Sequence, residues 1–299
     1  MPTAACRYTS PMAINYEKLM GWDFDDSIQN YTSRDTMLYA LGLGLGADPT
    51  DETELRFVYE EELQALPTMA VVLATPGPWL RHPDTGVDYQ KVVHGEQWLT
   101  LHRPLPAEGT VVGRARVAAV VDKGADKGAL IYLERTISPQ AGGEPYATIM
   151  TQAFARGDGG FGGPASDPNV PPVHKLPESA PHRSFDFDTL PRQALIYRLS
   201  GDYNPLHADP KVALSAGFHM PILHGLCTYG VAGFAILNTY CNYDANKLRS
   251  LQVRFSAPVY PGETLRTEMW QEGNIISFRC KAVERDVVVL SAGRAEIKP

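Results

Sequence analysis

The chain has 299 residues, a hydrophobic fraction of 44% and a formal net charge of −7, so it is long enough for one large or two modest domains with a buried core. The negative charge and the lack of any Lys/Arg-rich run argue against a nucleic-acid-binding surface. No segment is long and apolar enough to cross a bilayer, so no membrane partner is expected.

Cysteine usage and the two chain ends bear on cellular location. The cysteines form no Cys-x-x-Cys pair, which fits a reducing compartment in which they are small buried hydrophobic residues; they are Cys6, Cys227, Cys241 and Cys280. Residues 1–10 contain no apolar stretch typical of a signal peptide, and residues 296–299 do not form a Ser-Lys-Leu peroxisomal signal. We expect a cytoplasmic protein, or a peroxisomal one only if the chain is part of a longer polypeptide or is targeted otherwise.

The chain repeats a pattern of a helix followed by long strands. Residues 34–41 match residues 192–199, 158 positions later, in an Arg-x-x-x-x-Tyr-x-Leu pattern, and the proline-containing turn at 103–110 matches the one at 257–264, 154 positions later. Alternating or β-branched segments typical of strands lie at 97–102, 111–121, 130–137, 251–256 and 275–283. Two similar halves, each with a helix and antiparallel strands, are therefore predicted.

The segment between the halves, residues 157–181, is rich in glycine and proline and is predicted to be a linker. Within it, Gly157 to Gly162 satisfies the pattern Gly-x-Gly-x-x-Gly. Prolines follow from Pro164 onward, so no helix can present its N-terminus to a pyrophosphate, and we reject a dinucleotide site. We expect an N-terminal domain at 1–160, a linker at 161–184 and a C-terminal domain at 185–299.

Polar residues able to act in catalysis cluster just after residue 200. Asp202, Asn204 and His207 lie within six residues of one another, and a carboxylate beside an imidazole can hold and deprotonate a water molecule. Asn204 before Pro205 predicts an N-cap and the first residue of a short helical turn that carries His207. A second short helix is predicted at 211–216 by the same signal.

A buried helix is predicted at 226–237, where nearly every residue is apolar or small. Gly225 lies at its start, where backbone N–H groups lack intrahelical partners, the helix dipole is positive, and no side chain shields the amide. An oxyanion-binding site is therefore predicted there. Taken singly, these residues are also typical of ordinary helix caps, a half-buried histidine and close helix packing, so both interpretations stay open.

The first half contains a degenerate copy of this loop. Residues 41–46 alternate leucine and glycine and occupy the position that matches residues 200–202, but they contain neither an acid nor a histidine. One active site in each chain is therefore expected.

Two segments together resemble the signature of the hydratase 2 family, the R-specific 2-enoyl-CoA hydratases related to the MaoC dehydratases. They are Tyr197-x-Leu-Ser-Gly-Asp-x-Asn-Pro-Leu-His207 and His224-Gly-Leu-Cys-Thr228. The first half is similar to that of the two-domain eukaryotic-type members at residues 93–97, 103–106, 122–124 and 159–163. The resemblance thus covers nearly the whole chain.

The resemblance implies an α+β tandem (double) hot-dog fold, in which each half is a curled antiparallel sheet wrapped around a central helix. It implies reversible syn hydration of trans-2-enoyl-CoA to (3R)-3-hydroxyacyl-CoA in fatty acid metabolism, with a non-catalytic first half that accommodates a medium or long acyl chain around residues 67–78. It implies no metal and no cofactor, because coenzyme A is part of the substrate. Monomer and homodimer are both left open.

The resemblance also assigns individual residues, which we state as expectations. Asp202 and His207 jointly bind and activate water, Asn204 orients them and the Gly225 N–H holds the oxyanion, while the formal base is left open. The substrate-binding residues implied are His94, Gly95, Lys123, Tyr203, Pro205, Leu206 and Phe255. Lys123 would meet a CoA phosphate; a solvated lysine in a turn is the alternative.

Three other functions are weighed against this one. The first is a dehydratase or a hydratase for a short, branched, dicarboxylic or steroid side-chain thioester, with the same catalytic residues. The second is a metal hydrolase with ligands at His207, Asp209, His219 and His224, which lacks a His-Glu-x-x-His motif. The third is a non-catalytic acyl-CoA-binding module, against which the intact loop after residue 200 argues.

Overall fold

A computed structural model describes residues 14–298 and shows one ten-stranded antiparallel sheet. Its strands follow the order β1-β3-β4-β5-β2-β7-β10-β9-β8-β6. Their bounds are β1 Ser27–Tyr31, β2 Val92–Leu101, β3 Gly109–Asp122, β4 Ala129–Pro139, β5 Ala147–Ala155, β6 Arg183–Asp188, β7 Leu248–Phe255, β8 Thr264–Glu272, β9 Ile275–Ala282 and β10 Val287–Ile297. The strand segments predicted from the sequence fall on β2, β3, β4, β7 and β9.

The strand order carries the internal repeat into the fold. If β6 to β10 are matched with β1 to β5, the order is the same when counted inward from either edge of the sheet. The two five-stranded halves meet where β2 pairs with β7, with Leu99 opposite Leu251 and Glu96 opposite Arg254. The guanidinium of Arg254 forms an ion pair with the Glu96 carboxylate across this seam. The halves are thus joined by a continuous hydrogen-bonded ladder.

The longest helix, α6 (Gly225–Tyr240), lies in the core, and its residues from Cys227 to Leu237 are buried. A helix that is apolar all round is expected to be enclosed by other elements. An added Cβ would lie 2.5 Å from the Leu43 side chain at Gly230 and 2.7 Å from the Thr68 side chain at Gly233. These two glycines therefore permit close packing, as the sequence predicted for this helix.

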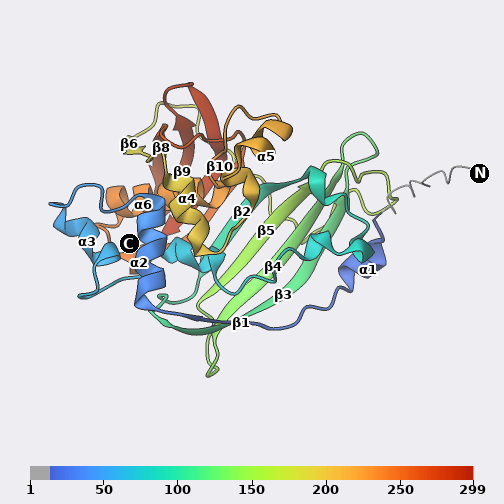
Figure 1. Cartoon of the computed structure of the whole chain (residues 1–299), viewed down its shortest axis with the longest axis horizontal. Coiled ribbons are helices and arrows are strands. Elements are labelled where there is room, and N and C mark those ends of the chain that lie inside the picture. The colour runs from blue at the N-terminus through green and yellow to red at the C-terminus, as the bar shows by residue number, and fades with distance from the viewer. Residues whose placement is uncertain (1–13, 299) are drawn as a thin grey trace, which may run out of the picture.

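Two further helices connect the halves: α2 (Ser33–Leu43) and α4 (Gln193–Tyr197). They pack together through Tyr39 and Tyr197, whose ring centroids are 5.9 Å apart. These tyrosines are the pair that the 158-residue repeat relates. Figure 1 shows the long strands β3, β4 and β5 extending away from the helices α2, α4 and α6. The remaining α-helices are α1 (Tyr16–Met20), α3 (Glu52–Val58) and α5 (Pro210–Ser215).

The first half has no long counterpart of α6 among residues 14–298. At the position that the 158-residue spacing relates to the start of α6, the structure has a short 3-10 helix, η1 (Pro67–Val72), whose residues 67–71 are buried. Ala74 follows with a positive φ of 44°, and Pro76 and Pro78 cannot donate helical hydrogen bonds. A long central helix is therefore a feature of the second half alone, and a role of residues 67–78 as an acyl-pocket wall stays a prediction.

The glycine-rich segment after β5 binds a carboxylate of the protein itself. Asp122, the last residue of β3, accepts hydrogen bonds from the N–H groups of Gly124, Gly160 and Gly162 at 2.8, 2.7 and 2.9 Å. These bonds hold the pKa of Asp122 below its usual value, although its partial burial opposes them. The Gly-x-Gly-x-x-Gly pattern therefore has a structural role here. The segment has no regular structure before β6, and the predicted domain boundaries stay predictions.

Two expectations about composition concern buried cysteines and membrane spans. Cys227, Cys241 and Cys280 are free and buried, as predicted, and Cys6 lies outside the described residues. Across residues 14–298, no helix combines the length and apolarity that a bilayer crossing requires.

Candidate active site

The loop after Gly201 is shaped by two local hydrogen bonds of Asn204. Its side-chain Oδ1 accepts from the N–H of Leu206 at 3.1 Å, which caps the 3-10 helix η6 (Pro205–His207) as predicted. Its backbone N–H donates to Oδ1 of Asp202 at 3.1 Å. One Asp202 oxygen is thus held by the backbone, which fixes the direction of the carboxylate.

His207 lies at the end of this turn and is only 8% exposed. Its Nδ1 is 2.8 Å from the carbonyl oxygen of Ile222. Because a carbonyl only accepts hydrogen bonds, Nδ1 carries the hydrogen and Nε2 of the neutral ring has a free lone pair. Burial lowers the pKa of His207, and the hydrogen bond to Ile222 and the charge of Asp202 oppose this shift in part. A neutral imidazole with a basic Nε2 results.

His224 immediately precedes α6 and packs against His207. The two imidazole rings are stacked with centroids 3.8 Å apart and planes at 28°. His224 Nε2 lies 3.1 Å from the backbone oxygen of Asp202, so its hydrogen is donated to that carbonyl. Burial, and then the neighbouring His207, lower the pKa of His224 to about 4. His224 therefore stays neutral and links the start of α6 to the Asp202 loop.

These three side chains form one cluster. A carboxylate oxygen of Asp202 and one ring nitrogen each of His207 and His224 lie within 4.8 Å of one another. The two histidines are buried, while the Asp202 carboxylate is exposed. Acid and imidazole therefore converge at a place that solvent can reach, which is the geometry needed to hold a water molecule.

The same donor set is also of a kind that metal ions use. Of the four metal ligands considered from the sequence, only His207 and His224 belong to it. His219 packs on the Tyr260 ring at 4.1 Å, and Asp209 caps α5 by accepting from the N–H of Lys211. The metal-hydrolase ligand set is therefore not assembled.

Gly225 is the first residue of α6, as predicted, and lies against Phe255. An added Cβ at Gly225 would be 3.1 Å from the Phe255 ring. Phe255 also contacts His94, with ring centroids 4.6 Å apart. Burial lowers the pKa of His94 to about 4, and the charge of Asp202 opposes this shift. His94 from β2 and Phe255 from β7 are thus brought next to the predicted oxyanion donor.

Gly95 shapes the strand that carries His94. The pairing of β2 with β5 shifts register between His94 and Glu96, and an added Cβ at Gly95 would lie 2.1 Å from Oε1 of Gln152. A larger residue at this position would require the end of the Gln152 side chain to move, so glycine lets the two strands keep this contact at the bulge. Gly95 acts here through the backbone.

The remaining predicted binding residues are nearer the surface. Tyr203 is 59% exposed and Pro205 is also exposed, whereas Leu206 is half-buried. Lys123 is exposed in the β3–β4 turn. This turn lies at the end of the sheet where β2 begins. Three strand spacings separate β3 from β2, which is about 15 Å. Lys123 is therefore not part of the cluster.

Two residues near the cluster were not expected to act in it. His224 was named as part of the family signature and as a possible metal ligand, but no catalytic or positioning role was predicted for it, although its position directly before Gly225 was a usable signal. Arg198 donates from Nη2 to the backbone oxygen of Tyr203 at 3.0 Å and lies over the Tyr203 ring at 5.2 Å. Its positive charge contributes to the lowered pKa values of both cluster histidines. Arg198 is thus a cation close to the candidate site.

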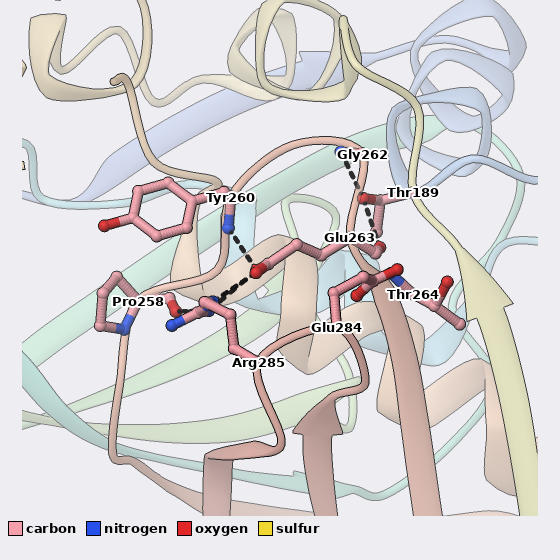
Figure 2. A network of polar contacts seen from close by, with 8 residues as sticks. All are labelled: Thr189, Pro258, Tyr260, Gly262, Glu263, Thr264, Glu284 and Arg285. Carbon is pink, nitrogen blue, oxygen red and sulfur yellow. Dashed lines mark hydrogen bonds and ion pairs between the residues drawn. The ribbon is translucent and has the colours of Figure 1, made fainter. Parts of the chain in front are cut away.

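A second polar network lies in the turn between β7 and β8, next to the residues that precede α6. Figure 2 shows the Glu263 carboxylate between the backbone N–H of Tyr260, which donates at 2.8 Å, and the guanidinium of Arg285. The Thr189 hydroxyl donates to the Glu263 backbone oxygen and accepts from the N–H of Gly262. This network fixes the turn between β7 and β8.

One backbone hydrogen bond joins this turn to the residues that precede α6. Arg285 also donates to the Pro258 carbonyl at 2.7 Å, and the next carbonyl, that of Val259, accepts from the N–H of Leu223 at 2.8 Å. Leu223 directly precedes His224. The position of His224 and Gly225 therefore depends on a turn held by a partly buried ion pair.

Comparison with known proteins gives matches over both halves. A family model described as an MFE-2 hydratase 2 N-terminal domain matches residues 29–157, and one described as a MaoC like domain matches residues 173–292. The chain is 39% identical over 304 residues to a protein named enoyl-CoA hydratase 2, peroxisomal, of Arabidopsis thaliana, which covers 97% of both chains. It is 38% identical over 276 residues to the peroxisomal multifunctional enzyme type 2 of Mus musculus, covering 90% of this chain and 37% of that protein.

Solved structures agree with the fold. The crystal structure of a MaoC-like dehydratase from Phytophthora capsici has a TM-score of 0.84 at 36% identity, covering 95% of this chain and 99% of the other. A protein of Mycobacterium tuberculosis described as having a double hotdog fold has a TM-score of 0.54 at 15% identity, covering 92% and 96% of the two chains. The tandem hot-dog fold expected from the sequence is confirmed.

Proposed function

Because this chain belongs to the family of MaoC-like and hydratase 2 hydro-lyases, we propose that it catalyses the reversible syn hydration of trans-2-enoyl-CoA to (3R)-3-hydroxyacyl-CoA. The observation that carries the proposal is the convergence of the Asp202 carboxylate and the His207 imidazole within 4.8 Å. A substrate with a medium or long acyl chain is part of the proposal. Such an enzyme would act in fatty acid metabolism, including β-oxidation.

In this proposal the attacking water lies between Asp202 and His207. The hydrogen bond of Nδ1 to Ile222 leaves His207 Nε2 to accept a proton from the water as its oxygen bonds to Cβ. Nε2 then returns this proton to Cα on the same face, so that the elements of water are added syn. The Asp202 carboxylate accepts a hydrogen bond from the other hydrogen of the same water molecule. It also stabilises the imidazolium that forms transiently on His207.

Negative charge develops on the thioester oxygen during the addition and needs a donor. The backbone N–H of Gly225 lies at the first position of α6, where the helix dipole is positive and the glycine leaves the amide uncovered. Asn204 contributes by fixing the direction of the Asp202 carboxylate through its backbone N–H. His207, Asp202 and Gly225 thus have separate tasks in one step.

Substrate contacts follow from the same arrangement. His94 and Phe255 lie beside Gly225, and Gly95 shapes the strand next to them. Tyr203, Pro205 and Leu206 lie on the loop that carries the acid. Arg198 and Lys123 are the cations that we propose for the CoA phosphates, with Lys123 reached only by an extended CoA moiety.

The proposal is tested with a panel of substrates. The rate of loss of enoyl thioester absorbance is measured for crotonyl-CoA and for longer, branched and dicarboxylic enoyl-CoAs, with chiral analysis of the 3-hydroxy product. The expected result is R product and faster turnover of medium or long chains. S product would contradict the proposal, and a preference for a short or specialised thioester would favour the alternative substrate class. Absence of any absorbance change would favour a non-catalytic acyl-CoA-binding module.

Two further expectations from the sequence stay predictions. A cytoplasmic location is expected from the sequence, whereas the two relatives described above have names that include the word peroxisomal. Cell fractionation with a catalase marker distinguishes these locations. Sedimentation of the purified protein distinguishes a monomer from a homodimer.

A further inference from the structure

A cavity of about 190 Å³ lies at the end of the seam opposite to the candidate active site. Leu101 at the end of β2 and Leu248 at the start of β7 both line it, and so does Pro67 at the start of η1. His94, at the other end of β2, is seven residues from Leu101, so the two sites are separated by about 23 Å along the strand. The cavity is therefore distinct from the candidate active site.

The internal repeat explains why a cavity exists at this place. The 154-residue spacing relates Leu101 to Phe255 and His94 to Leu248, and the 158-residue spacing relates Pro67 to Gly225. The cavity is therefore the first-half counterpart of the active site. Its walls occupy equivalent positions, but leucines replace the histidine and the phenylalanine, and a proline replaces the glycine.

The cavity lining combines apolar and cationic side chains. Leu63, Leu101, Leu105 and Leu248 supply apolar surface, and Arg103, Arg249 and Lys298 supply positive charge. No aspartate or glutamate belongs to the lining, and within residues 14–298 none of the three cations has an ion-pair partner. An uncompensated group of cations favours an anion.

Arg103 is the best fixed of these cations. Its guanidinium lies over the Tyr146 ring at 4.0 Å, and its Nε is buried without a hydrogen-bond partner in the part of the chain that the structure describes. A buried N–H without a partner is costly unless a ligand or water satisfies it. A guanidinium stacked in this way can present its N–H groups to a carboxylate in a bidentate manner.

We propose that this cavity binds a short aliphatic carboxylate, with the alkyl chain against the leucines and the carboxylate on Arg103 and Arg249. The volume is below the range of about 300–1,000 Å³ for sites that hold drug-sized ligands, so a ligand of few heavy atoms fits. The site retains the acyl-binding character of its active counterpart while the catalytic groups are absent. It is thus a second ligand site in each chain.

The test is a calorimetric titration of the full chain with sodium hexanoate. The active site is first saturated with an equilibrated mixture of crotonyl-CoA and its hydration product, so that hexanoate cannot enter it. The expected result is one hexanoate bound per chain. Hexanol, which lacks the charge, and inorganic phosphate, which lacks the alkyl chain, are each expected to bind at least ~10-fold more weakly.

Variants assign the site. Arg103→Gln with Arg249→Gln should weaken hexanoate binding by ~10-fold or more and leave the kcat for crotonyl-CoA hydration unchanged, which also shows that the variant is folded. Arg249→Gln alone retains the Arg103–Tyr146 stack and should give a smaller loss. The control is Arg34→Gln, which changes an exposed arginine of the same half outside the cavity.

Unchanged hexanoate affinity in the double variant, or no binding once the active site is filled, would overturn the proposal. Phosphate binding as tight as hexanoate binding would overturn the choice of an aliphatic ligand.

Discussion

The imidazole of His224 is stacked on that of His207, with ring centroids 3.8 Å apart, and donates from Nε2 to the backbone oxygen of Asp202. One buried histidine thereby fixes both members of the acid–imidazole pair. It reaches them from the residue before the predicted oxyanion donor, so a single side chain links all the groups to which we assign chemistry.

His224 is therefore expected to be a positioning residue. His224→Phe keeps a ring against His207 but leaves the Asp202 carbonyl without its donor, and we expect kcat to fall by ~10-fold or more with little change in KM. His224→Gln retains an N–H donor and should recover part of the loss. Steady-state kinetics with crotonyl-CoA measure both variants. Equal losses in kcat for the two variants would show that the hydrogen bond to Asp202 is not what His224 contributes.

The contact between Gly225 and Phe255 predicts a steric effect that can be reversed. Gly225→Ala places a Cβ 3.1 Å from the Phe255 ring, and displacement of the amide should lower kcat by ~10-fold or more. Phe255→Leu in the same chain gives the new methyl group room and should restore part of the activity. The double-mutant cycle is read from initial hydration rates. Strictly additive losses would mean that this contact does not position the amide.

Much of the fold was predictable because its signals are local or periodic. The cap at Asn204 depends on residues two positions apart, and the burial of α6 follows from its uniformly apolar composition. The repeat of the Arg-x-x-x-x-Tyr-x-Leu pattern predicted two similar halves, and Tyr39 and Tyr197 do pack together. Such features need no knowledge of distant contacts.

Other features were not predictable because they depend on residues that meet only in the folded chain. His224 contacts Asp202 across 22 positions, and the glycine-rich segment wraps Asp122 across 38 positions at Gly160. The resemblance implied a central helix in each half, but it did not predict the short η1, where the prolines after Ala74 affect the local conformation. Asp202 and His207, which lie close together in the sequence, were thus found as an acid–imidazole pair, but the contact of His224 with both of them was not predicted.

Stability should fall as pH falls below neutrality. Burial lowers the pKa values of His94 and His224 to about 4, against 6.5 for a free histidine. The unfolded chain then binds more protons than the folded one between pH 6.5 and 4, so the free energy of unfolding decreases as pH falls through this window and levels off above about pH 7. By pH 5.0 the decrease is about 2 kcal/mol for each histidine. Urea unfolding at pH 7.5, 6.0 and 5.0 measures it.

A matched variant separates the contribution of one histidine. His94→Asn removes one of the histidines whose pKa is lowered in the folded chain and should make the dependence on pH shallower between pH 6.5 and 5.0. The matched control is His182→Asn, at an exposed histidine before β6. A wild-type stability that is constant from pH 7.5 to 5.0 would contradict the assignment of His94 and His224 as neutral in the folded chain.

Chelation tests whether the reaction requires a metal ion bound to the three-residue cluster. Asp202, His207 and His224 have a donor set suited to a divalent cation. Since our account gives His207 Nε2 a proton-transfer role, a metal on that nitrogen would prevent the reaction. Dialysis against EDTA should leave kcat unchanged, and added Zn²⁺ should inhibit. Loss of activity on chelation, with recovery on addition of metal, would contradict the account.

The most direct test of the central claim is the hydration rate of crotonyl-CoA by Asp202→Asn and His207→Gln, each with the wild-type fold verified by circular dichroism. Both substitutions keep the approximate size of the side chain. His207→Gln removes the nitrogen that accepts the water proton, and Asp202→Asn removes the charge that stabilises the imidazolium. We predict that each lowers kcat by ~10²-fold or more, with the two losses far from additive because the groups act on one water molecule. Near-normal hydration by either variant would contradict the account.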